Sequence, residues 1–116
     1  MTNLVVLKGS LGGDPEFHDS ENGQNYVVMS LAVTNRILNQ ENKQWQDGEV
    51  NWFRCASWKS WVILDAKNLH KGSLIRVEGK LKQSEFKDKQ GNMRTSIDII
   101  INSMEEIVRR SKKLAS

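Results

Sequence analysis

Short apolar runs separated by polar stretches follow one another along the whole chain and predict a mainly β domain. The runs predict five strands, over residues 3–10, 26–33, 50–58 and 73–86 and around Ile97–Ile101. The segment 11–25 contains glycines and the only proline, which are typical of a turn, so we expect it to connect the first two strands as they pair. The polar stretch 35–49 predicts a long mobile hairpin loop, and 87–92 a second hairpin tip.

One helix is expected between the third and fourth strands. Apolar residues recur at helical spacing between residues 61 and 71, Ser60 precedes them as a candidate N-cap, and Gly72 suits the position after the helix. Residues 103–106 also match a capping box. They predict a short terminal helix lined by Ile107, Val108 and Leu114.

Two strands alternate in a way that separates a core face from an outer face. In the third strand Phe53, Cys55 and Ser57 share the expected core face, opposite Trp52, Arg54, Ala56 and Trp58. In the fourth strand the core face carries Ile75, Val77, Gly79 and Leu81, and the last strand continues it with Ile97, Ile99 and Ile101. A glycine at position 79, in mid-strand, indicates a bulge or a sharp bend. Five strands with one helix between strands 3 and 4 favour an all-β Greek-key barrel, the OB-fold.

Composition changes the picture little. With 116 residues, 38% hydrophobic and 27% charged, the chain predicts one folded domain over residues 1–104 and a short basic tail over 105–116. The formal net charge of +3 is compatible with polyanion binding without establishing it. Acidic residues outnumber basic ones in the first 34 positions and basic residues outnumber acidic ones afterwards, so a polyanion should prefer the later segments.

Several classes of function find no support in the residues. The single cysteine, Cys55, excludes an internal disulfide, and no Cys/His cluster has the spacing of a zinc site. We therefore expect no metal, no cofactor and a reducing cytoplasm. No signal peptide or membrane span is evident. No carboxylate pair, nucleophile or phosphate loop forms a catalytic pattern, so the chain is not expected to be an enzyme.

The most informative pattern is a strand face on which aromatic and basic side chains alternate. Trp52, Arg54 and Trp58 should lie beside the outer face of the fourth strand, which carries Phe86. Rings offer stacking surfaces to unpaired bases and cations neutralise phosphates, whereas a duplex hides its base faces. The expected stacking residues are Trp52, Trp58 and Phe86, with Trp45 as a further candidate, and the expected phosphate contacts are Arg54, Arg76, Lys80, Lys82 and Lys87.

Other interpretations of the aromatic residues stay open. Tryptophans of an amphipathic strand usually pack in the core, although Arg54 buried between two indoles would then need a partner. Trp45, in a polar loop, indicates either a ligand contact or a subunit contact. We expect Trp61 to pack the helix onto the barrel, and Phe17 and Tyr26 to be packing residues.

Five motifs in order resemble the bacterial-type single-stranded DNA-binding protein family. They are LKGSLGGDPE at residues 7–16, SLAVT at 30–34, WFR at 52–54, KGSLIRVEGKL at 71–81 and DKQGN at 88–92. The resemblance implies an OB-fold that assembles, commonly as a homotetramer, and wraps single-stranded DNA regardless of its sequence during replication, recombination and repair in the nucleoid. It places stacking aromatics at Trp52, Trp58 and Phe86, and another at the position of Ile37, where this chain has no ring.

The end of the chain departs from the family. Members usually continue into a glycine-rich linker and an acidic tip that recruits partners, whereas this chain ends in a basic segment over residues 109–116. Recruitment through an acidic tip is therefore not expected. The alternative is a primosome-type interaction module that bridges replication proteins and binds DNA weakly. An OB-fold nuclease is disfavoured because no carboxylate cluster is present to hold a metal ion.

Overall fold

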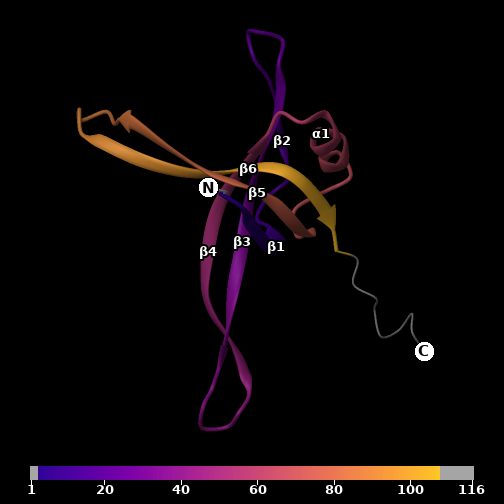
Figure 1. Ribbon diagram of the computed structural model, residues 1–116, viewed down its shortest axis with the longest axis vertical. Helices are drawn as coiled ribbons and strands as arrows, with labels where there is room; N and C mark the ends of the chain where they lie inside the picture. Colours follow the sequence, from indigo (N-terminus) through magenta and orange to yellow (C-terminus); the bar gives the residue numbers. More distant parts are fainter. Residues whose placement is uncertain (1–2, 108–116) are drawn as a thin grey trace.

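The computed structural model describes residues 3–107, which form six strands and one helix (Figure 1). The elements are β1 (Val5–Leu11), β2 (Glu16–Asp19), β3 (Asn25–Leu38), β4 (Trp45–Ser57), α1 (Ser60–Ala66), β5 (Leu74–Lys87) and β6 (Met93–Glu106). The strands lie in the order β1-β5-β6-β4-β3-β2, and β1 also pairs with β3. That extra pairing closes five of the strands into a barrel.

The barrel has the predicted OB-fold topology, with α1 between its third and fourth strands. β4 and β6 pair in parallel, and the other pairs are antiparallel. The structure has one strand more than the five predicted, namely β2. It pairs only with the start of β3, and its four side chains are exposed, so no alternation of apolar residues marks it in the sequence.

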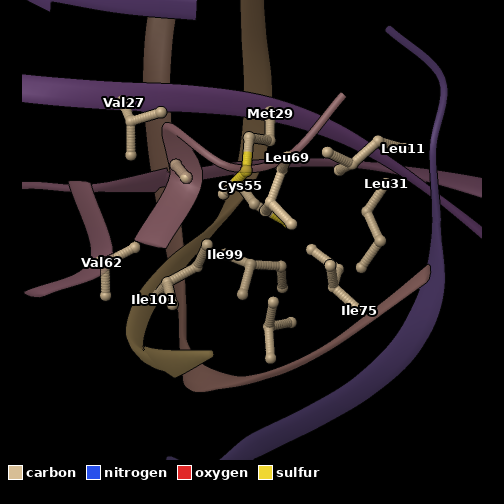
Figure 2. Close-up of a cluster of buried hydrophobic side chains, with 12 residues drawn as sticks. Leu11, Val27, Met29, Leu31, Cys55, Val62, Leu69, Ile75, Ile99 and Ile101 are labelled. Carbon is tan, nitrogen blue, oxygen red and sulfur yellow. The ribbon is translucent and has the colours of Figure 1, made fainter. Parts of the chain in front are cut away.

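The core lies inside the barrel and is formed mainly by aliphatic side chains (Figure 2). Its fully buried members include Met29, Leu31, Cys55, Val62, Ile75, Val77, Ile99 and Ile101. The alternation predicted for the third and fourth strands is thus confirmed at the centre of the barrel, except at Ala56, which was expected on the outer face and is buried. It is wrong for Leu81 and Ile97, which are exposed, because the β5–β6 hairpin leaves the barrel there and projects as an arm (Figure 1).

Two glycines allow neighbouring strands to approach closely, Gly9 where β1 meets β3 and Gly79 in the β5–β6 pair. A Cβ at Gly79 would lie 2.1 Å from the carbonyl oxygen of Ile100, and one at Gly9 would lie 2.3 Å from that of Ala32. The β5–β6 register shifts between Glu78 and Gly79. The irregularity predicted at Gly79 is therefore confirmed, but the bulged strand is β6, whose Asn102 has no partner on β5.

The predicted mobile loop over residues 35–49 is wrong for most of its length. β3 continues to Leu38 and β4 begins at Trp45, so only residues 39–44 form the turn. The two strands leave the barrel as a second arm, at the bottom of Figure 1. Both faces of this arm are in solvent, so its strands do not alternate between apolar and polar residues. Their polar sequence therefore resembles that of a loop.

Both helix predictions need correction. α1 ends at Ala66, earlier than expected, and its N-cap is Lys59, whose own side chain makes no capping bond. Val62 and Ala66 are buried, whereas Trp61, expected to pack the helix onto the barrel, is half exposed. Residues 103–106 belong to β6 and pair with β5, so the capping-box prediction is wrong there. Val108, Leu114 and the basic residues of the predicted tail lie outside the described residues.

Cys55 is a buried free thiol, and its burial, followed by the nearby charge of Asp98, raises its pKa from 9.0 to about 12. At pH 8 this lowers the thiolate fraction about a thousandfold, so we expect a disulfide reagent to label the native protein far more slowly than the unfolded chain. The pKa of this thiol is higher in the folded protein than in the unfolded chain. Its contribution to the free energy of unfolding is therefore fully present below about pH 9 and is lost as the pH rises toward 12. Fast native labelling at pH 8 would contradict this burial.

Among residues 3–107, no helix is long and apolar enough to cross a membrane.

Candidate nucleic-acid interface

The outer face of β4 and Trp58, the residue directly after the strand, present two indoles with the guanidinium of Arg54 between them. Trp52 is 63% exposed and Trp58 is 45% exposed, and the side chain of Arg54 also faces solvent. These rings are therefore not part of the core. The alternation of β4, which buries Cys55 and Ser57 on the other face, is what directs them outward.

Neighbouring strands complete a groove around Arg54. In the β-sheet register Arg54 lies opposite Ser30 of β3 and Asp98 of β6, and Asp98 lies opposite Lys82 of β5. The groove, of about 320 Å³, is lined among others by Tyr26, Arg54, Trp58, Lys82, Ser84, Asp98 and Ile100. The structure thus brings together three of the predicted site residues, namely Trp58, Arg54 and Lys82.

A stack of three rings lies beside the groove, and two of them, Trp58 and Tyr26, line it. The rings of Trp58 and Tyr26 have centroids 5.4 Å apart at an interplanar angle of 28°, and Tyr26 stacks on His18 at 5.0 Å and 16°. Tyr26 was expected to be a packing residue and instead lines the groove. No sequence signal identified this stack, because it depends on β2, which positions His18 opposite Tyr26.

Trp52 borders a second hollow, of about 250 Å³, toward the β1–β2 connection. Its ring lies over Gly12, where a Cβ would come within 2.4 Å of the indole atom Cζ3. The same hollow is lined by Asp14 and Glu16. Their carboxylates make this end of the surface less favourable for phosphate than the end at Lys82.

Phe86 and Lys87 lie on the β5–β6 arm. Phe86 is 49% exposed and follows Lys80, Lys82 and Ser84 on the outer face of β5. Lys87 pairs with Met93 at the end of the arm and, by alternation, occupies the opposite face. The structure therefore aligns Phe86 with the groove and does not bring Lys87 into it.

Two more predicted residues lie away from the groove. Arg76 is opposite Lys8 and Glu105, and its Nη2 lies 2.8 Å from Oε1 of Glu78. The hydrogen bond and charge of this guanidinium lower the pKa of Glu78. Trp45 is exposed near the turn of the β3–β4 arm, opposite Leu38. Phe17, expected to pack, is also exposed on β2.

A carboxylate that sequence reasoning missed sits inside the groove. Nη1 of Arg54 donates to Oδ2 of Asp98 at 2.8 Å, across the parallel β4–β6 pair. The pair holds the guanidinium against the sheet and neutralises much of its charge. Lys80 and Lys82 form no ion pair with any other residue between 3 and 107, so their charge is less neutralised than that of Arg54.

Within residues 3–107, no group of three or more His, Cys, Asp or Glu side chains is placed to hold a metal ion.

Comparison with known proteins gives a consistent set of relatives. The model of the family described as "Single-strand binding protein family" matches residues 2–107. "Single-stranded DNA-binding protein 1" of Tropheryma whipplei (strain Twist) is 32% identical over 109 residues, which are 94% of this chain and 59% of that protein. The single-stranded DNA-binding protein of Mycobacterium leprae is 30% identical over 100 residues, which are 86% of this chain and 60% of that protein. This chain thus spans about three fifths of the length of these curated relatives.

Two solved structures share the fold. The small single-stranded DNA-binding protein from Streptomyces coelicolor matches with a TM-score of 0.75 and 28% identity, covering 93% of this chain and 97% of that one. A Plasmodium falciparum SSB, solved in complex with ssDNA, matches with a TM-score of 0.77 and 20% identity, covering 92% and 94%. At that identity the second likeness supports the barrel alone.

Proposed function

This chain belongs to the single-strand binding protein family, and on that premise we propose that it binds single-stranded DNA independently of sequence, without catalysing a reaction. We propose that it acts in DNA replication, recombination and repair, in the nucleoid of the cytoplasm. The observation that carries the proposal is the groove beside β4, in which the exposed ring of Trp58 lies next to Arg54 and Lys82.

The chemistry of the groove suits an unpaired strand. Every base has a flat face that can stack on an indole or phenyl ring, so rings bind bases with little regard to sequence. We propose that Trp52, Trp58 and Phe86 stack with bases, and that Arg54, Lys80 and Lys82 contact phosphates. Arg76, Lys87 and Trp45 lie outside the groove and would contact only a longer strand that continues over the barrel and its arms.

The alternative, a primosome-type module with weak DNA binding, is not favoured. The relatives are named as single-stranded DNA-binding proteins, and the rings that stacking requires are exposed. We further propose that the protein assembles with copies of itself, as a tetramer rather than a dimer. Two exposed apolar side chains, Leu4 just before β1 and Val6 on it, support such an assembly.

A fluorescence titration tests the proposed function. Oligo(dT) should quench the tryptophan fluorescence, and the logarithm of the binding constant should fall with the logarithm of salt concentration by about 0.7 for each neutralised phosphate. Heparin, a polyanion without bases, serves as the control and should not cause this quenching. If oligo(dT) causes no quenching at low salt, or if a duplex of equal length binds as tightly, the proposed function is wrong.

A further inference from the structure

Trp61 is the one aromatic residue of α1, and it is held in place without being buried. Its indole Nε1 donates to the carbonyl oxygen of Asn102 at 2.8 Å, yet the residue is 52% exposed. Asn102 is the residue that the β6 bulge leaves without a partner on β5. A strand irregularity thus supplies the acceptor that fixes the edge of the ring while much of its surface stays in solvent.

A basic hollow adjoins this ring. It measures about 350 Å³ and its lining includes Lys59, Lys80, Ile100 and Asn102. The ammonium of Lys59 lies 5.3 Å from the centroid of the Trp61 ring. The hollow also contains Glu78, but that carboxylate already accepts hydrogen bonds from Arg76 and Ser103, so it opposes phosphate less than a free one would.

This hollow continues the groove already described. Ile100 lines both, and Lys80 and Lys82 follow each other on the outer face of β5, Lys80 in the hollow and Lys82 in the groove. The chain itself joins the two as well, because Trp58, Lys59 and Trp61 lie within four consecutive residues. Rings and cations therefore extend past Ile100 toward α1.

We propose that Trp61 is an additional base-stacking platform and that Lys59 contacts the phosphate beside it, so that a strand in the groove continues across Ile100 to α1. This inference rests on the proposed function of the groove. At an exposed site the attraction between the Lys59 ammonium and the indole is weak. A base can therefore take the place of the ammonium on the ring, and the freed ammonium can pair with the adjacent phosphate.

The length of the oligonucleotide separates this platform from the groove. Trp61→Ala should weaken binding of oligo(dT) of about 16 nucleotides by about tenfold and leave binding of about six nucleotides nearly unchanged. Leu64→Ala is the matched control, since Leu64 is an exposed apolar residue on the same helix, whereas Trp61 contacts Asn102 and Lys59, which line the hollow. It should leave both affinities unchanged.

The other outcomes assign the failure to one proposal or the other. Trp52→Ala should weaken binding of both oligonucleotides, because Trp52 belongs to the groove. If the wild-type protein binds neither oligonucleotide, the proposed function itself is wrong. If the wild type binds and Trp61→Ala binds both lengths equally well, the groove stands and the platform is wrong. Trp61→Phe keeps a ring and removes the N–H bond to Asn102. Loss of binding in this variant would assign the effect to helix positioning and overturn the proposal.

A direct readout covers the case in which Trp61→Ala does not fold. A variant with Trp45→Phe, Trp52→Phe and Trp58→Phe retains rings at those positions and leaves Trp61 as the only tryptophan. Its fluorescence should be quenched by the 16-nucleotide oligomer and much less by the six-nucleotide one. Absence of quenching under conditions where the oligomer binds would overturn the platform.

Discussion

Replacing Trp52 and Trp58 together by alanine is expected to weaken oligo(dT) binding by about 30-fold to 10⁴-fold while the barrel stays folded. The estimate follows from about 1–3 kcal/mol for each base that loses its stacking partner. Both rings are exposed, Trp52 on the outer face of β4 and Trp58 directly after it, so their removal creates no core cavity. Titration of the variant by a fluorescently labelled oligonucleotide measures the loss, and circular dichroism measures the fold.

Phe17→Ala is the matched control for this pair. Phe17 is an exposed aromatic residue on β2 and is not part of the ring stack. Its neighbour His18 is the residue of β2 that stacks on Tyr26. Its removal should leave the affinity within about twofold of wild type. Unfolding of the double variant would show that the indoles stabilise the barrel, and an unchanged affinity would show that the strand binds elsewhere.

Gly79→Ala is expected to remove about 3–5 kcal/mol from the free energy of unfolding. The added Cβ would lie 2.1 Å from a backbone oxygen and 2.8 Å from a backbone carbon of Ile100. A backbone cannot rotate away as a side chain can, so β5 and β6 would have to separate at the bulge. Since small domains are stable by only about 5–15 kcal/mol, this loss should be plain in urea denaturation.

Gly13→Ala provides the comparison for this prediction. A Cβ at Gly13 would meet nothing within 4 Å, so we expect its free energy of unfolding to change by less than about 1 kcal/mol. A Gly79→Ala protein as stable as Gly13→Ala would mean that β5 and β6 do not approach each other closely at Gly79.

The alternation of side chains predicted the barrel wherever one face of a strand is buried. Phe53, Cys55 and Ser57 point inward as their spacing required, and the bulge at Gly79 is where a glycine in mid-strand indicated it. The same rule failed at Leu81 and Ile97, since a strand that leaves the barrel keeps its pattern but loses its core. Local periodicity carries no information about where the packing partner ends.

Parts of the candidate site depend on contacts between distant segments and could not be predicted. Tyr26 joins the ring stack only because β2 pairs with β3, and Asp98 reaches Arg54 only because β4 and β6 run side by side in parallel. The exposure of Trp61 was missed for another reason. Helical spacing suggested a packing residue, but α1 is short, and Val62 and Ala66 already fill its contact with the core.

The bulge at Gly79 has a consequence for the entropy of binding. The carbonyl oxygen of Ile101 accepts the Ser57 hydroxyl at 2.8 Å, and the next carbonyl, of Asn102, accepts the Trp61 indole. These two bonds anchor both ends of the short segment that carries Trp58 and Lys59. Side chains that are ordered before a ligand arrives lose little freedom when it binds. A single irregular pairing in β6 therefore pre-organises the connection between the last barrel residue of β4 and the helix.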